Sequence, residues 1–340
     1  MRLSLRLLLA AFCYYSGIVH LVRRWTQRSR RTLIILNYHQ AAGGNLRRHL
    51  LYLRRFYRML HLEDALQELY TVDTKKTSSD DKRTPLVLTF DDGYRDNYTH
   101  AFALARELQV PITVFPAVGY VESGVPFWWQ EGEHLTQNAQ VDIITLEGQT
   151  YQILKFQERL QLAAAIDERL RHASSVAERE TFLQTMRERL AVPCYTKRDE
   201  TDACPLTWAQ IREMDASGWV SFGAHTMHHP LLAQLADPAE VRYEIEACRA
   251  MLEQQLGHSI RALAYPFGQP EEVGDEAPEA ARQAGYTWVL TTVQGFNTSK
   301  SDPHQLRRIY GDVSRHWLIM AVGTAGIWNY GASLLRFLLR

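Results

Sequence analysis

The sequence predicts an α/β protein built around a parallel sheet that is closed, or partly closed, as a barrel. Short apolar runs rich in β-branched and aromatic residues alternate with segments of helical spacing, and this alternation is typical of βαβ units. Polar residues directly follow several of the apolar runs, where α/β folds place their chemistry. The 340 residues, of which 46% are hydrophobic, are enough to bury one large core with additions.

One segment interrupts this alternation. Residues from about 126 to 207 include a charged stretch of helical spacing at 155–190, which predicts a helical insertion over the functional end of the barrel. Within it, Trp128 and Trp129 could stack on sugar rings or pack the insertion onto the barrel. The polar segment 71–84 predicts a solvent-exposed loop. Strands are expected at 33–38, 86–90, 111–115, 219–222, 263–265 and 288–292, and helices at 46–57, 62–70, 96–109, 238–256 and 276–284.

Two adjacent carboxylates end the apolar run 86–90, where Asp91 and Asp92 precede Gly93. On an extended backbone adjacent side chains point to opposite sides, so these two cannot bind one ion in the same way. One can bind a metal while the other accepts a proton. The alternative is that they form a turn and cap the next helix, since Asp-Gly is common turn chemistry.

Three histidines follow the expected strand at 219–222, at positions His225, His228 and His229. Pro230 disfavours a helix here, so this stretch is expected to be a strand end that opens into a loop. A single histidine is more often an ordinary polar residue than a ligand, but three within five residues favour a metal site. Two imidazoles and one carboxylate form the open three-ligand set of a hydrolytic Zn²⁺ or similar ion.

Three motifs, in this order, resemble those of the polysaccharide deacetylases of the carbohydrate esterase family four type. They are Thr-Phe-Asp-Asp-Gly at 89–93, His-Thr-Met-His-His-Pro at 225–230 and Tyr-Pro-Phe-Gly at 265–268. Leu-Asn-Tyr-His at 36–39 resembles an exopolysaccharide-associated subgroup that supplies a catalytic histidine from the N-terminal side. The resemblance covers residues from about 33 to 311 and implies an incomplete (β/α)7 barrel.

The resemblance also implies a metal site and a base. Asp92, His225 and His229 would bind a divalent metal, usually Zn²⁺, with Co²⁺ or Ni²⁺ as alternatives. Asp91 would be the general base that takes a proton from the attacking water.

The other implied roles concern the acid and the oxyanion. His39 would protonate the departing amine; His304 is the other candidate, but it lies in a polar loop, whereas His39 ends an expected strand. The acetamide oxygen would meet a backbone N–H near Phe267, next to Pro266.

One position departs from the family pattern. Many members carry an arginine two residues before the proline of the third motif, where it orients the base, and here that position is Ala264. The exopolysaccharide subgroup also lacks this arginine. Arg308 is therefore a candidate to lie near the base instead.

Together these expectations describe a hydrolase that removes N-acetyl groups from sugars of a bacterial surface polysaccharide or of its lipid-linked precursor. A first alternative is action on another amide or on an O-acetyl ester. A second is a catalytically silent, membrane-bound scaffold that binds glycans.

The two ends of the chain differ from the rest in charge. The formal net charge is zero, yet residues 1–62 hold twelve arginines and no acidic residue. Arginines flanking an apolar run favour an anionic membrane surface over nucleic acid as the partner. The run at 7–22 would span about 24 Å as a helix, less than the roughly 30 Å hydrocarbon core, so we expect a helix lying on the membrane.

The arginines that follow this run favour the cytoplasmic face, and a cleaved signal peptide with a periplasmic or cell-envelope location is the alternative. We expect a membrane-associating segment at 1–30, the barrel with its insertion at 31–316, and an apolar segment at 317–340 that could seek a surface or pack on the barrel. Cys194 and Cys204 could form a disulfide in an exported protein, but a reduced protein would carry the same residues. The sequence does not decide the oligomeric state.

Overall fold

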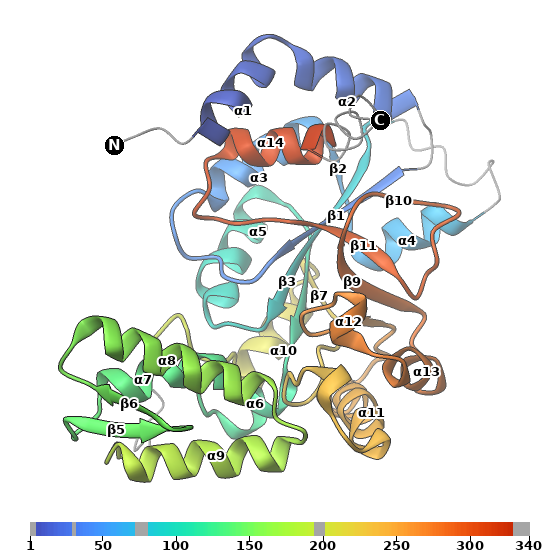
Figure 1. Cartoon of the computed structure of the whole chain (residues 1–340). Coiled ribbons are helices and arrows are strands. Elements are labelled where there is room, and N and C mark those ends of the chain that lie inside the picture. The colour runs from blue at the N-terminus through green and yellow to red at the C-terminus, as the bar shows by residue number, and fades with distance from the viewer. Residues whose placement is uncertain (1–4, 29–31, 72–80, 194–200, 329–340) are drawn as a thin grey trace, which may run out of the picture.

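A parallel sheet of seven strands curves into a nearly closed barrel at the centre of the molecule (Figure 1). The structure is a computed structural model of the chain and describes residues 5–28, 32–71, 81–193 and 201–328. It confirms the predicted incomplete seven-stranded barrel. In sheet order the strands are β7 (Val220–Phe222), β4 (Ile112–Pro116), β3 (Pro85–Asp92), β1 (Thr32–Tyr38), β11 (Leu306–Tyr310), β9 (Trp288–Gln294) and β8 (Ala262–Ala264).

The two ends of this sheet, β7 and β8, meet at a seam with little pairing. Just beyond β7, Ala224 forms a parallel bridge with Leu263 of β8. The N–H of Ala224 donates to the carbonyl of Ala262, and its carbonyl accepts from the N–H of Ala264, each at 2.9 Å. Because His225 follows this bridge directly, the seam delivers it to the C-terminal end of the barrel.

Alternate strand residues face the barrel interior and the surrounding helices, as the two-residue period of a strand requires. On β1, Leu33 and Ile35 join an interior cluster that also holds Phe115 of β4 and Ala264 of β8. Ile34 instead packs in the cluster shared with the outer helices. The same alternation decides which polar side chains enter the top of the barrel.

Helices cover the outside of the barrel (Figure 1). The helices predicted at 62–70 and 238–256 are confirmed with the same bounds. The strand at 306–310 was not predicted, because its alternation of apolar and basic residues is short. The outer elements are α3 (Leu46–Phe56), β2 (Arg58–Met59), α4 (Leu62–Tyr70), a π-helix (Asn97–Phe102), α5 (Ala103–Leu108), α6 (Val118–Ser123), α10 (Trp208–Ala216), a 3₁₀ turn (Leu232–Gln234), α11 (Pro238–Leu256), α12 (Pro270–Val273), α13 (Glu276–Gln283) and β10 (Asn297–Thr298).

The predicted insertion is a separate lobe with its own apolar cluster, at the lower left of Figure 1. Its helical stretch divides into two helices, and Ser175 caps the second by accepting from the N–H of Glu178. A β-hairpin precedes them that was not predicted, and its turn places Glu147 and Gly148 at φ 50° and 82°. The lobe contains a 3₁₀ turn (Trp128–Gln130), α7 (Glu131–Gln137), β5 (Ile143–Leu146), β6 (Gln149–Gln152), α8 (Phe156–Arg171) and α9 (Val176–Arg189).

The apolar run at 7–22 does not form the single helix that we expected. It divides into α1 (Leu5–Tyr15) and α2 (Ile18–Arg28), which meet at an angle of 70°. Gly17 lies between them at φ 84°, a left-handed conformation that ends helices. Within the described part of the chain no single helix is long and apolar enough to cross a membrane; only the bent pair meets that test together.

The apolar C-terminal segment begins with α14 (Trp317–Thr324), which packs between α1 and the barrel. Residues 329–340 lie outside the described residues. Cys194, which could form a disulfide with Cys204, also lies outside the described residues. So do residues 72–80 of the expected loop.

A packing test follows from the seam. A Cβ atom on Gly223 would lie 2.2 Å from Cε1 of Phe115 and 3.0 Å from the carbonyl oxygen of Ala262. Phe115 is fully buried and has little room to move. We therefore expect Gly223→Ala to lower the free energy of unfolding by about 1–3 kcal/mol, the usual cost of overpacking a core.

Urea unfolding measures this difference. Gly323→Ala is the control, because no atom lies closer than 3.7 Å to its added Cβ. The control should be at least as stable as the unaltered protein, and up to about 1 kcal/mol more stable because alanine favours the helix over glycine. Equal unfolding free energies for Gly223→Ala and the unaltered protein would contradict this account of the seam.

Candidate active site

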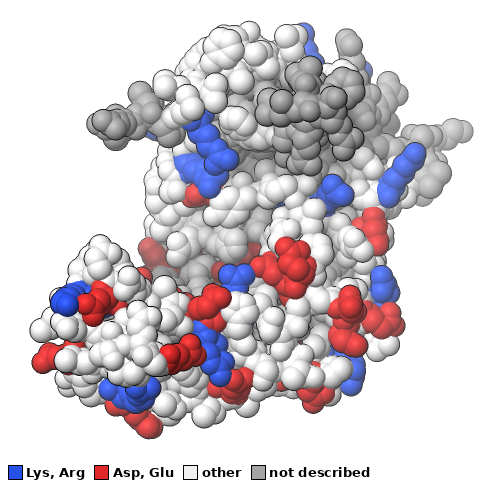
Figure 2. All heavy atoms as spheres, viewed as in Figure 1, with Lys and Arg blue, Asp and Glu red and all other residues white. Residues whose placement is uncertain are grey.

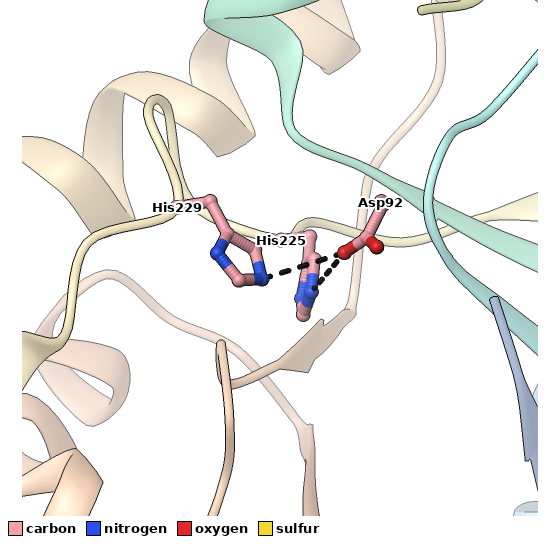
Figure 3. Close-up of side chains that lie close together, drawn as sticks. All are labelled: Asp92, His225 and His229. Carbon is pink, nitrogen blue, oxygen red and sulfur yellow. Dashed lines mark ion pairs between the residues drawn. The ribbon is translucent and has the colours of Figure 1, made fainter. Parts of the chain in front are cut away.

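Three side chains from distant parts of the chain meet at the C-terminal end of the barrel (Figure 3). Asp92 ends β3, and His225 and His229 lie in the loop after β7. The Nε2 atoms of both imidazoles lie 3.4 Å from the same oxygen of Asp92, Oδ1. All three side chains are buried. The structure thus brings together the residues predicted as metal ligands.

These side chains fit a divalent cation. Oδ1 of Asp92 is buried and accepts no hydrogen bond, which is costly for a carboxylate oxygen unless a positive charge compensates it. The two 3.4 Å separations match the tetrahedron edge of about 3.3–3.4 Å that follows from ligand distances of about 2.0–2.1 Å at zinc. Imidazole nitrogens with a carboxylate oxygen suit zinc and neighbouring transition metals.

A hydrogen bond orients the imidazole of His225. Nδ1 of His225 lies 2.7 Å from the carbonyl oxygen of Ala264, which can only accept, so Nδ1 donates its proton there. In the neutral ring this leaves the lone pair of Nε2 toward Asp92, the arrangement typical of a ligand histidine. Ala264, which lacks the family's arginine side chain, thereby still serves the site through its backbone.

The histidine loop is fixed from α11 by Glu244, which is fully buried. Its carboxylate accepts from the backbone N–H of His228 at 2.8 Å and from Nδ1 of His228 at 2.7 Å. Its carbonyl accepts from the N–H of Met227 at 3.1 Å. His228 is therefore occupied by Glu244, and it is not part of the Asp92 cluster.

Left-handed backbone conformations cluster at this site. Asp92, Thr226, His229 and Phe267 have φ values of 70°, 62°, 53° and 58°. Such values are costly for residues with a Cβ atom and persist where the surroundings hold them. At His229 a hydrogen bond helps to hold this conformation: its N–H donates to Oγ1 of Thr226 at 3.1 Å. The ligand geometry is thus imposed by the fold.

Asp91 faces the barrel interior and has a different partner. Nη1 of Arg308 donates to Oδ1 of Asp91 at 2.8 Å, and both residues are 1% exposed. Nε of Arg308 donates to the carbonyl of Thr291 at 2.8 Å, which fixes the guanidinium plane. Arg308 enters from β11, two residues after the inward-facing Leu306. The structure places Arg308 beside Asp91, where the sequence made it a candidate.

The charges of the two carboxylates follow from these contacts. Burial raises the pKa of Asp91, but the Arg308 guanidinium and the His225 imidazole outweigh burial and hold the pKa below its ordinary value. Burial also opposes ionisation of Asp92, yet the two imidazoles hold its pKa well below the ordinary value. Burial lowers the pKa of His229. These directions favour charged carboxylates and a neutral His229. Burial lowers the pKa of His225, but the two aspartates outweigh it and raise that pKa, so a cation would compete with a proton at this imidazole.

His39 reaches the same end of the barrel from β1. Tyr38 pairs with Phe90 in parallel register, so His39 follows at the level of Asp91. Its side chain is partly exposed and lines the cleft above the two aspartates. His304 precedes β11, which runs parallel to β1, and therefore lies at the opposite end of the barrel.

The segment after His39 is held by polar contacts that the sequence did not reveal. Nδ2 of Asn97 donates to the carbonyl of His39 at 2.9 Å. Oδ2 of Asp96 accepts from the N–H groups of Ala41 and Ala42 at 2.7 and 2.9 Å. Both side chains come from the turn just after Asp91 and Asp92, so the two parts of the site support each other.

Pro266 and Phe267 form the turn after β8. The carbonyl of Pro266 accepts from the N–H of Gly268, and the carbonyl of Phe267 accepts from Oγ1 of Thr292. The N–H of Phe267 donates to no other atom in the described part of the chain. The ring of Phe267 lines the cleft, 5.1 Å from that of His229 between centroids.

The insertion contacts both the loop that carries His229 and the turn that carries Phe267. Nε1 of Trp128 donates to the carbonyl of His229 at 3.0 Å, and the ring of Trp129 lies 4.5 Å from that of His229 between centroids. Arg171 lies over the ring of Phe267, 4.5 Å from its centroid, at the end of α8. Trp128 is buried and serves packing, whereas Trp129 also lines the cleft.

A cleft of about 650 Å³ opens over these groups. Its floor holds Asp91, Asp92, His225 and His229. One wall comes from the insertion and another from the segment after β11. The lining residues are His39, Gln40, Ala42, Asp91, Asp92, Tyr94, Trp129, His225, His229, Phe267, Thr292, Tyr310, Gly311, Asp312, Val313 and Ser314.

Sequence reasoning missed several residues of the site. Glu244 carried a usable signal, because it is a charged residue on the otherwise apolar face formed by Val241, Ile245 and Cys248 of α11. Tyr94, whose hydroxyl accepts from Nε1 of Trp129 at 2.7 Å, carried none, since that contact joins segments far apart in the chain.

Comparison with known proteins identifies the family. The profile described as polysaccharide deacetylase matches residues 78–289, more than half of the chain. Among curated protein sequences, none matches. The match confirms the family expected from the motifs; the subgroup suggested by the Tyr-His pair stays a prediction.

Three solved structures share the fold. IcaB from Ammonifex degensii is 18% identical, with a TM-score of 0.55 over 87% of this chain and 97% of that one. The Streptococcus pyogenes deacetylase PplD in complex with acetate is 19% identical, with a TM-score of 0.53 over 85% and 96%. A de-N-acetylase from Aggregatibacter actinomycetemcomitans is 15% identical, with a TM-score of 0.53 over 86% and 99%. With its barrel, its Asp92 cluster and the profile match, this chain belongs to the polysaccharide deacetylase family.

Proposed function

We propose that the protein is a metal-dependent hydrolase that removes N-acetyl groups from sugars of a bacterial surface polysaccharide or its lipid-linked precursor. The observation that carries this proposal is the buried Asp92, His225 and His229 cluster beside the Asp91–Arg308 pair, on the floor of an open cleft. Two neighbours in fold are a deacetylase in complex with acetate and a de-N-acetylase, which supports acetate as the product here.

Asp92, His225 and His229 would hold the ion, with Zn²⁺ preferred and Co²⁺ or Ni²⁺ as alternatives. When bound, such an ion supplies a Lewis acid that lowers the pKa of water from about 15.7 to about 7 and polarises an amide carbonyl. Asp91 takes the proton of the attacking water, since it is charged at neutral pH and is not among the ligands. Arg308 holds Asp91 in one orientation and compensates its charge in the buried state.

The remaining groups serve the two ends of the amide. As water adds to the acetamide carbon, the N–H of Phe267 donates to the oxygen that gains negative charge. As the C–N bond breaks, His39 gives a proton to the nitrogen, so that acetate and a neutral amine leave. Trp129 and Tyr310 in the cleft lining offer aromatic surfaces for sugar rings.

The direct test is acetate release from N-acetylglucosamine oligomers by the zinc-loaded protein. We expect release that a chelator abolishes and added zinc restores. Matched O-acetylated sugars should react more slowly relative to their uncatalysed rates. Release from the esters alone would contradict N-deacetylation, and release that persists without metal would contradict the ion's role.

Substitutions at the two adjacent aspartates should have different effects on zinc binding and on turnover. We expect Asp92→Asn, His225→Ala and His229→Ala each to weaken zinc binding by about 10²-fold or more, beyond the roughly 10- to 100-fold loss typical of a residue that only orients a ligand. Asp91→Asn should keep zinc and lose turnover, because it removes the base and leaves the ligands. Equilibrium dialysis with acetate release measures both.

His304→Ala is the matched control for the histidine variants, since it lies at the far end of the barrel and should change neither quantity. If Asp91→Asn lost zinc and Asp92→Asn kept it, the two roles would be reversed.

His39 should matter most for poor leaving groups. We expect His39→Ala to keep zinc and to lose roughly 10²-fold or more in kcat on acetamides, the usual scale for a general acid. The loss should shrink for an activated acetyl ester, whose leaving group needs no proton. Steady-state kinetics on both substrates decide this: an equal relative loss on amide and ester shows that His39 is not the acid.

A further inference from the structure

An apolar face lies open on the two N-terminal helices. On α1, residues spaced one helical turn apart expose large side chains, including Leu5 (73%), Leu8 (51%) and Phe12 (65%). On α2, Leu21 (68%) and Trp25 (62%) do the same one turn apart. Large apolar side chains exposed together on one side of a helix mark an interaction surface more often than a bare protein surface.

The opposite faces of these helices are fixed to the protein. Ala10 of α1 and Val19 of α2 are buried in a cluster with Leu318 and Val322 of α14. Arg23 of α2 is also buried, with its guanidinium 4.0 Å from the ring centroid of Phe56 on α3. The open face therefore has a fixed orientation relative to the barrel.

The charged side chains of α1, α2 and α3 are all basic. Arg6 and Arg24 are exposed on the helices themselves, and α3 beside them exposes Arg48, Arg54 and Arg55. Residues 1–62 contain no acidic side chain. In Figure 2 the upper part of the molecule, over α1 and α2, accordingly shows none, whereas acidic side chains are scattered over the insertion and the helices below.

We propose that this α1–α2 face binds the surface of an anionic lipid bilayer. Its apolar side chains would enter the boundary of the acyl chains, while the arginines meet lipid phosphates. A second copy of the chain is a poorer occupant, because a two-fold interface would set these arginines against themselves. Each helix has 11 residues, about 16 Å, and keeps one side packed on the protein, which suits the bilayer surface rather than its interior.

The face is connected to the cleft through the chain. Residues 310–314 line the cleft, and α14 begins three residues later and packs on α1. A bilayer under α1 and α2 would hold this cleft wall at a fixed distance from the membrane. Resting on the proposed function, this favours a substrate whose glycan is attached to a membrane lipid over a free polymer.

Flotation of the full chain with vesicles tests the lipid proposal. Vesicles of phosphatidylcholine and phosphatidylglycerol should carry the protein upward in low salt, and vesicles of phosphatidylcholine alone should carry much less. Leu8→Glu/Phe12→Glu should lower the partition coefficient by about tenfold or more. The control Leu154→Glu/Phe156→Glu, at two exposed apolar sites on the insertion, should leave it unchanged.

Three further variants keep the test independent of how well the α1 variant folds. Leu21→Glu/Trp25→Glu places the same change on α2, in case the α1 variant unfolds in urea more easily. Arg6→Gln and Arg24→Gln should each reduce binding to the anionic vesicles by roughly fivefold and leave binding to neutral ones unchanged. Deleting α1 and α2 is less informative, because it would uncover the apolar face of α14.

The proposal would be overturned if both glutamate variants bound anionic vesicles as strongly as the unaltered protein does. It would also be overturned if the protein did not bind vesicles but self-associated, and the same variants abolished the self-association. The occupant of the face would then be a second copy of the chain. Resistance to alkaline carbonate extraction would also overturn it in favour of a membrane span. Acetate release from soluble oligomers should be the same in all these variants, so a failure of the lipid proposal is distinct from a failure of the proposed activity.

Discussion

A buried carboxylate oxygen that faces two imidazoles without a hydrogen bond is the contact on which the site depends. Oδ1 of Asp92 has no donor in the described structure, and both Nε2 atoms lie 3.4 Å from it. A fold tolerates such an arrangement where a cation compensates it. The barrel seam, the Glu244 anchor and the left-handed turns at Asp92 and His229 all serve to hold these atoms together.

The second constraint is that two neighbouring carboxylates have different partners. Strand geometry sends Asp91 into the barrel and Asp92 toward the histidines, so the proposed proton acceptor and the proposed ligand are adjacent residues. Arg308 supports Asp91 from β11, which only β9 separates from β8, the strand where Ala264 lacks the family's arginine. The guanidinium therefore reaches the base from another strand, and the backbone of residue 264 is free to orient His225.

Local patterns predicted a barrel with a metal site at its strand ends, whereas the seven strands and the choice of Asp92 over Asp91 as a ligand came from the resemblance to the family. Apolar runs ending in Asp92 and His225 mark strand ends, and the ends of parallel strands meet at one edge of a barrel. Contacts between distant segments could not be predicted from local patterns. Examples are the contact of Trp129 with His229 and that of Arg171 with Phe267. The bend at Gly17 was missed because the apolar run continues through it, and the strand of Arg308 because it is short.

The central claim is that Asp92 and both histidines hold a divalent cation while Asp91 stays with Arg308. Diffraction from zinc-soaked crystals of the full chain, recorded on both sides of the zinc absorption edge, tests it most directly. The account predicts one strong anomalous peak among Oδ1 of Asp92 and the Nε2 atoms of His225 and His229, with the Asp91–Arg308 ion pair intact. A peak bound to Asp91, or no peak at this site in crystals that hold zinc elsewhere, would contradict it.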